Sequence, residues 1–194
     1  MGLPKELPYF TPEQYLDIER ESEIRHEYLD GYVYAMAGES PDHSTICFNL
    51  VVIIGTQLRG KPCQGFSPNM KVRTDPNDLF SYPDLTVVCG EPVYHDSRRD
   101  VLLNPTVIFE VLSPSTEKYD RGDKFRRYRE NIPSLADYVL VSQSTAKIEL
   151  YTKQENDEWT RIEVSGLENE LYIASIDCHV PLVEVYENIT FTEN

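Results

Sequence analysis

The sequence predicts one α/β or α+β domain over residues 1–194, built on a central mixed sheet flanked by helices. The chain is 194 residues long, without a repeat or a linker, which fits a single domain of ordinary size. Residues 106–112 are almost entirely apolar, as expected for a central strand buried on both faces. Segments with apolar residues at helical spacing are interspersed with short β-rich segments.

The first sixty residues predict a helix, a hairpin and a second helix. Thr11-Pro12 supplies an N-cap and a proline at the first helical position. Asp30-Gly31 is a hairpin turn signal between two strand candidates. Ser40-Pro41 opens the second helix, and Gly60 ends it. The expected ranges are 12–20, 23–30, 32–37 and 41–59.

The remaining residues predict strands around one more helix. Asp120 and Asp123 resemble an N-cap with an acid three residues later, so a helix is expected over 120–130, before Pro133. A turn is expected at 75–78. The last strand candidates form additional C-terminal antiparallel strands. The candidates are 69–73, 84–89, 106–112, 138–142, 146–152, 159–164 and 182–186.

Composition and charge restrict the function classes. The formal net charge is −15, with 33 acidic and 18 basic residues, which argues against a broad, non-specific clamp on nucleic acid. A local basic strip or a metal-bridged phosphate site stays compatible with this charge. Four cysteines without a C-x-x-C pair argue against a zinc module. The start lacks an apolar signal core and no run is long enough to span a bilayer, so a cytoplasmic protein without membrane association is expected.

Glu110 is the single charge in the apolar strand 106–112. A buried, unpaired carboxylate is costly, so the charge needs a partner. Three interpretations stay open: a structural ion pair with a basic residue, a position at the strand end in contact with water, or a metal ligand.

A second acid favours the metal interpretation. Asp84 stands at the start of the strand candidate 84–89, and Glu27 is a third acid that could reach the same place. Two carboxylates from neighbouring strands at one sheet edge are a natural site for Mg²⁺, although Pro-Asp also often only opens a turn.

A basic segment follows the Glu110 strand. Residues 118–129 hold six of the eighteen bases, which favours phosphate contact, but acids in the same segment also fit a solvated helix face. Lys124 and Tyr128 stand four residues apart on one side of the expected helix. Because the loop from Glu110 is short, the Lys124 ammonium is expected to point back at the carboxylates.

These segments together resemble the Uma-two family of restriction-endonuclease-like proteins, in the PD-(D/E)XK nuclease superfamily. The resemblance covers most of the chain. It rests on Pro83-Asp84, on 109–116 (FEVLSPST), on 120–128 (DRGDKFRRY), and on matching segments at 27–31, 40–43 and 137–141.

The resemblance implies a restriction-endonuclease-like fold and a Mg²⁺-dependent or Mn²⁺-dependent site that cleaves phosphodiester bonds of DNA. Asp84 matches the metal-binding Asp, and Glu110 matches the acid of (D/E)XK. The Val111 carbonyl and Glu27 would be further metal ligands. At the position of the superfamily's lysine this chain has Leu112, and Lys124 matches the lysine that relatives with this gap are expected to recruit from the next helix.

Five more residues are candidates for the site. Arg121, Arg126 and Arg127 would contact the nucleic-acid backbone, and Tyr128 lies on the same helix. His43 matches a family position, either in the site or as a hydrogen-bonded structural residue.

Three function classes follow. The leading hypothesis is a metal-dependent endonuclease that acts as a homodimer. The alternative is an inactive nucleic-acid-binding or protein-interaction module on the same fold, which Leu112 and the negative charge favour. A structural oligomer is the third, on the strength of 13 tyrosines and a β-rich C-terminal third.

Overall fold

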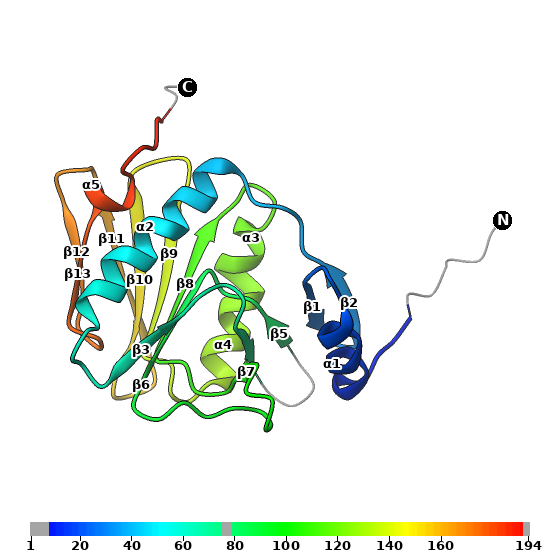
Figure 1. Cartoon of the computed structure of the whole chain (residues 1–194). Helices are drawn as coiled ribbons and strands as arrows, with labels where there is room; N and C mark the ends of the chain where they lie inside the picture. The colour runs from blue at the N-terminus through cyan, green and yellow to red at the C-terminus, as the bar shows by residue number, and fades with distance from the viewer. Residues whose placement is uncertain (1–7, 75–78, 192–194) are drawn as a thin grey trace.

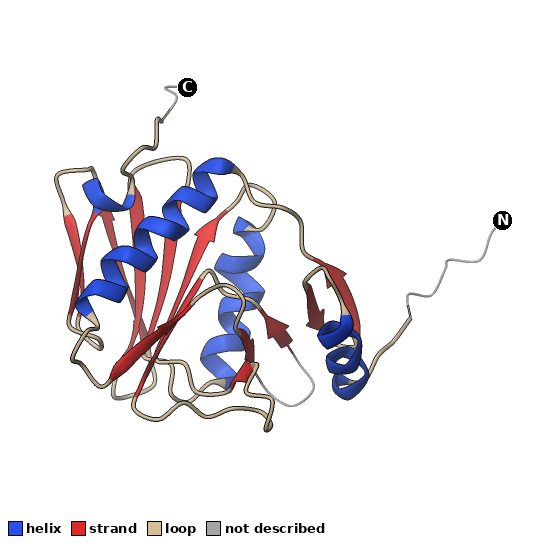
Figure 2. Cartoon of the chain, in the orientation of Figure 1, coloured by secondary structure: helices blue, strands red, loops and turns tan. Residues whose placement is uncertain are grey.

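The computed structural model describes residues 8–74 and 79–191, so the turn expected at 75–78 lies outside the described residues. Figures 1 and 2 show helices on a curved sheet with a second, smaller sheet beside it. The helices are α1 (Pro12–Glu21), α2 (Pro41–Gln57), α3 (Glu117–Tyr119), the π-helical turn η1 (Asp120–Lys124), α4 (Phe125–Asn131) and α5 (Leu182–Val185). The strands are β1 (His26–Leu29), β2 (Tyr32–Ala35), β3 (Cys63–Phe66), β4 (Lys71–Arg73), β5 (Leu79–Ser81), β6 (Leu85–Cys89), β7 (Val101–Leu102), β8 (Val107–Leu112), β9 (Asp137–Ser142), β10 (Lys147–Lys153), β11 (Trp159–Ser165), β12 (Glu170–Ile173) and β13 (Cys178–Pro181).

The larger sheet is mixed, as expected. Its strand order is β11-β10-β9-β8-β6-β3. β8 and β9 are parallel, while β6 pairs with β8 in the antiparallel direction. All six residues of β8 are buried, which confirms the central strand. Glu110 therefore lies in the middle of the sheet.

Helices cover both faces of this sheet. On one face, Ile46, Leu50 and Ile54 of α2 pack against β6, β8 and β9. On the other face, Phe125 and Tyr128 of α4 pack in a core with Ile108, Leu112 and Leu140. Residues of β8 alternate between these two cores, so Glu110 shares the α4 face with Leu112.

The smaller sheet, with the order β2-β1-β5-β4-β7, supplies further acids. Asp30 and Gly31 both have positive φ, 49° and 90°, as the β1–β2 hairpin turn requires. β1 pairs with β5, which leads directly to Asp84 and β6. In Figure 1 the α3–α4 segment stands between this sheet and the larger one.

The helix expected at Asp120 begins earlier, which corrects its N-cap assignment. The backbone carbonyl of Ser113 accepts from Glu117 N at 2.9 Å, and its hydroxyl accepts from Thr116 N at 3.2 Å. Ser113 thus closes a turn ahead of α3, whose N-cap residue is Thr116. Asp120 lies inside the π-helical turn and is buried.

The strand expected at 182–186 is wrong, because Leu182–Val185 is the helix α5. Leu182 and Val185 are buried, whereas Val183 is 58% exposed. That spacing of three suits one face of a helix, and a short apolar run does not distinguish helix from strand.

Strands β3, β5, β7, β12 and β13 were not expected from the sequence. β3 pairs with β6 so that Cys63 stands opposite Cys89, and these two cysteines form a disulfide. Disulfides persist mainly in oxidising compartments. The cytoplasmic location stays a prediction.

Candidate functional site

Glu110 is the centre of the site. Glu110 is only 4% exposed to solvent. Oε1 of its carboxyl lies 2.9 Å from Lys124 Nζ and accepts a hydrogen bond from Tyr128 Oη at 3.2 Å. The expected approach of Lys124 to Glu110 is therefore present, and Tyr128 is brought to the same carboxyl.

Asp84 lies against the backbone that follows Glu110. Its Oδ2 accepts a hydrogen bond from Val111 N at 2.7 Å. This contact joins the start of β6 to β8 next to Glu110. The two acids are on neighbouring strands, as predicted, but β8 is an inner strand of the sheet, so Glu110 is not at a sheet edge.

Lys124 is held by three carboxylates from different elements. Besides Glu110, its Nζ lies 3.6 Å from Glu27 Oε1 and 3.5 Å from Asp120 Oδ1. Glu27 also accepts a hydrogen bond from Tyr82 N at 3.3 Å. The side chain of Lys124 is 6% exposed, so its ammonium is turned inward.

Asp120 is a site residue that the sequence reasoning missed. It is 3% exposed and faces Lys124 from the preceding turn of the same helical segment. The spacing of four residues between these two opposite charges was the signal that could have found it. π-helical turns occur often at functional sites.

Leu112 does not enter the polar site. It is 4% exposed and packs in the α4-side core. The ammonium beside Glu110 is that of Lys124, at the end of η1.

His43 lies at the same end of β8. Its Nε2 is 3.0 Å from the Val111 carbonyl oxygen and 3.5 Å from Asp84 Oδ2. The N-cap hydroxyl of Ser40 accepts from His43 N at 3.1 Å and holds the first turn of α2. Both the site interpretation and the hydrogen-bonded interpretation of His43 match this position.

Burial shifts the proton affinities of the site. Desolvation raises the pKa of Glu110 well above its usual range, although the Lys124 ammonium opposes this. Burial lowers the pKa of Lys124, but the carboxyl of Glu110 and its neighbours outweigh burial and raise the pKa well above its usual value. Desolvation also raises the pKa of Asp120. The lysine therefore keeps its charge.

These groups line a cavity of about 490 Å³. Among the described residues that line it, five are acidic, and Lys124 is the one lysine or arginine. The acids are Glu27, Glu39, Asp84, Glu110 and Asp120. Such an excess of negative charge in a partly enclosed space favours a cation.

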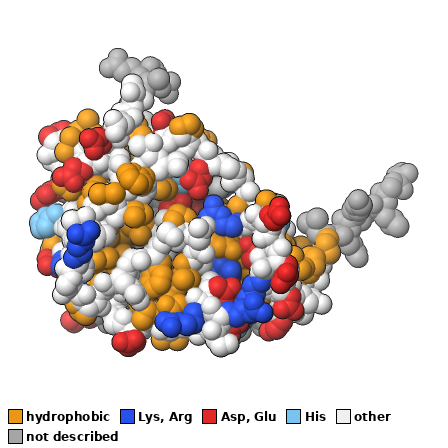
Figure 3. Space-filling view, in the orientation of Figure 1, with side chains coloured by type: hydrophobic (Ala, Val, Ile, Leu, Met, Phe, Trp, Pro, Cys, Tyr) orange, Lys and Arg blue, Asp and Glu red, His pale blue; other side chains and the backbone are white. Residues whose placement is uncertain are grey.

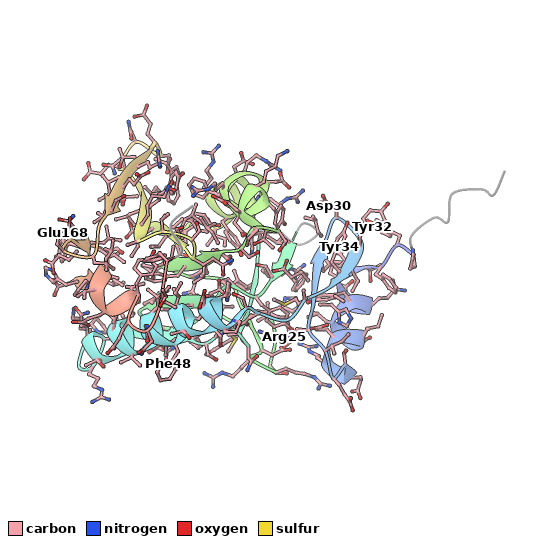
Figure 4. All side chains as sticks on the ribbon, turned by 90° about the horizontal axis from the view of Figure 1, so that it is seen from above. Arg25, Asp30, Tyr32, Tyr34, Phe48 and Glu168 are labelled. Atoms are coloured by element: carbon pink, nitrogen blue, oxygen red, sulfur yellow. A yellow bond between two sulfur atoms is a disulfide. The ribbon has the colours of Figure 1, made fainter. Side chains whose placement is uncertain are left out.

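The three arginines expected at nucleic acid each contact acids of this chain. Arg121 pairs with Glu117 at 2.8 Å and with Glu149 at 2.5 Å. Arg126 pairs with Asp123 and Glu130 on its own helix. Arg127 pairs with Asp123 and, across the sheet interface, with Asp30. Figure 4 labels Asp30 at the tip of the β1–β2 hairpin. None of the three lines the cavity, and their nucleic-acid contact stays a prediction.

No helix in the described part of the chain is long and apolar enough to cross a membrane.

Comparisons with known proteins agree with this fold. A solved structure from Anabaena variabilis, titled as "a putative nuclease belonging to DUF820", superposes with a TM-score of 0.75. The match covers 93% of this chain and 99% of that chain at 14% sequence identity, so it shows the shared fold.

Two relatives come from Synechocystis sp., and both are described as uncharacterized. The first is 35% identical over 184 residues, covering 95% of each chain. The second is 30% identical over 161 residues, covering 83% of this chain and 90% of its own. The profile of the Uma2 family, described as "Putative restriction endonuclease", matches residues 12–177. The chain therefore belongs to the Uma2 family of nuclease-fold proteins.

Proposed function

We propose that this protein is a metal-dependent endonuclease that hydrolyses phosphodiester bonds of DNA. The observation that carries the proposal is the meeting of Asp84, Glu110 and Lys124 at one end of β8. Family membership and the nuclease-like fold support the general activity.

The donor set fits a hard divalent cation, Mg²⁺ or Mn²⁺. Carboxylates of Asp84 and Glu110, with Glu27 nearby and the carbonyl of Val111, are oxygen ligands of the kind these ions prefer. The acidic excess of the cavity supports the same choice. When bound, such an ion would polarise a phosphate oxygen and lower the pKa of a bound water.

The side chains of the site would have separate roles in the hydrolysis. Lys124 would orient the attacking water and offset the charge that develops on the phosphate oxygens. Glu27 and Asp120 would hold the ammonium in place, and Tyr128 would hold the carboxyl of Glu110. Water oxygen bonds to phosphorus, one phosphorus–oxygen ester bond breaks, and the water proton is passed on to the departing oxygen. The products are a phosphomonoester and an alcohol.

The test compares cleavage by the native protein with that of Asp84→Asn and Glu110→Gln. Both substitutions keep an oxygen acceptor for the hydrogen bonds from Val111 N and Tyr128. A panel of single-stranded, duplex and branched DNA is incubated with Mg²⁺ or Mn²⁺, or with EDTA. Asp17→Asn, on the exposed side of α1, is the control.

We expect divalent-dependent cleavage by the native protein and the control, and at least a ~100-fold loss in both site variants, about 2.7 kcal/mol of barrier. Cleavage that survives both substitutions would reject the assignment. The alternative of an inactive binding module predicts no cleavage and no heat of Mg²⁺ or Mn²⁺ binding in calorimetry.

A homodimer is a further part of the proposal, because cutting two strands uses two sites. Apolar side chains on the outer face of α2, namely Phe48, Val51 and Val52, support it (Figure 3). Figure 4 shows Phe48 on the side of α2 away from the sheet. Sedimentation of the native protein and of Phe48→Glu tests the oligomeric state, and a monomeric native protein would contradict the dimer.

A further inference from the structure

The imidazole of His43 lies at the site but has no role in the proposed reaction. His43 Nε2 faces two oxygens that are both hydrogen-bond acceptors, the Val111 carbonyl at 3.0 Å and Asp84 Oδ2 at 3.5 Å. One N–H can satisfy one of them. A cation at this place would instead take all three atoms as ligands.

The other ring nitrogen of His43, Nδ1, has its own neighbours. His43 Nδ1 lies 3.7 Å from Glu39 Oε2 and 3.5 Å from Cys47 Sγ. The Glu39 contact is longer than a hydrogen bond, but its negative charge on this side of the ring favours the proton on Nδ1 and leaves Nε2 free to bind a metal.

Cys47 is close, but its chemistry is different. Ligand atoms of His43, Cys47 and Asp84 all lie within 4.8 Å of one another. Thiolate ligands suit softer metals, whereas Mg²⁺ and Mn²⁺ suit oxygen ligands. Cys47 Sγ lies 3.5 Å from His43 Nδ1, the ring nitrogen that is not the proposed ligand, and we assign it to packing beside the imidazole.

The position of the imidazole is fixed by the fold. His43 is 9% exposed and lies in the first turn of α2, whose next turn packs through Ile46 into the core under β8. Ser40 caps this turn. The capped first turn of α2 and its packing therefore hold the His43 ring beside the end of β8.

We propose that His43 Nε2 is a ligand of the same divalent cation as Asp84 and the Val111 carbonyl, and that the site therefore prefers Mn²⁺ to Mg²⁺. The inference rests on the cation site of the proposed function. Imidazole suits first-row transition metals, whereas Mg²⁺ keeps oxygen ligands and water. Mn²⁺ is the ion of that series that also suits carboxylate and carbonyl oxygens, so it fits this mixed set of ligands better than Mg²⁺ does.

The decisive experiment is pulsed electron paramagnetic resonance of the native protein loaded with Mn²⁺. A coordinated imidazole couples its ¹⁴N nucleus to the manganese electron spin, which a purely structural histidine does not. We expect this ¹⁴N modulation in the native protein, its loss in His43→Gln, and its retention in His179→Gln. His179 is the matched control, because its exposed ring pairs with Glu170 on β12.

Calorimetry gives a second readout without any substrate. In His43→Gln we expect the affinity for Mn²⁺ to fall at least ~10-fold, and in Glu39→Gln by a smaller factor. The affinity for Mg²⁺ should change less than ~threefold in both, so the preference for Mn²⁺ is lost. Circular dichroism confirms that the variants fold.

The possible failures are distinguishable. Mn²⁺ bound with no ¹⁴N modulation, and bound equally by His43→Gln, would overturn the histidine ligand and leave the carboxylate site of the proposed function in place. A native protein that binds neither Mn²⁺ nor Mg²⁺ would overturn both proposals.

Discussion

Lys124→Met gives the sharpest test of the site's electrostatics. Methionine keeps an unbranched apolar stem but removes the ammonium that lies 2.9 Å from Glu110. The substitution leaves Glu27, Glu110 and Asp120 without their shared cation. Working in EDTA prevents a divalent ion from replacing the lost charge.

The expected loss of stability is large because both partners are buried. Removing the ammonium breaks its contacts with three carboxyl groups at once. Breaking one side of a buried pair costs about 3–5 kcal/mol, because the other side loses its partner without regaining water. We expect the free energy of unfolding of Lys124→Met to fall by that amount.

Urea denaturation measures the change, with Glu110→Gln and the double variant completing a cycle. Because the neutral amide no longer needs the ammonium, the double variant should lose about 2 kcal/mol less than the two single losses together. Lys118→Met, on the exposed side of the same segment, should stay within about 0.5 kcal/mol of the native protein. A Lys124→Met loss below about 1 kcal/mol, or strict additivity in the cycle, would refute the buried ion pair.

Three further predictions concern stability. Reduction of the Cys63–Cys89 disulfide, or Cys63→Ser, should lower the free energy of unfolding by about 3.5 kcal/mol, because the bond closes a loop with a sequence separation of 26. Tyr128→Phe should cost about 1–3 kcal/mol in urea, because Tyr128 Oη bonds both Ser81 at 2.7 Å and Glu110. Burial raises the pKa of Asp137, so its contribution to stability is full below the ordinary carboxyl range and is lost as pH rises through the raised value. Asp137→Asn should therefore gain stability relative to the native protein between pH 4 and pH 7.

Each of these three stability predictions would be contradicted by a specific result. An unchanged melting temperature in reductant would contradict the disulfide's contribution. A Tyr128→Phe variant within about 0.3 kcal/mol of the native protein would mean that the hydroxyl bonds contribute nothing. A stability difference between Asp137→Asn and the native protein that is the same at pH 4 and pH 7 would contradict the raised pKa.

The elements that sequence analysis predicted well depend on local chemistry. Ser40-Pro41 begins α2 where expected, and the Asp30-Gly31 turn joins β1 to β2. β8 was predicted from a short apolar run rich in β-branched and aromatic residues, which favours a strand, and all six of its residues are buried. Lys124 was placed correctly because a short loop and a helix leave few directions for a side chain that follows Glu110 so closely.

The elements that were missed depend on long-range pairing. β5 and β7 have three and two residues, too short to show a period, and they exist because β4 pairs with both. The disulfide follows from the register of β3 on β6, which no spacing of cysteines reveals. Asp120 was missed because a local capping rule explained it, although the helical segment already begins at Glu117.

The π-helical turn at Asp120–Lys124 makes the length of this segment part of the chemistry. Such a turn holds one residue more than a regular helix, and each residue corresponds to about 100° of rotation. Since Phe125 and Tyr128 anchor the following turns in the core, deleting one residue here would swing the preceding turn, and Asp120 with it, off the cavity. Relatives with a gap at this point would therefore have to supply the counter-charge to their lysine from somewhere else.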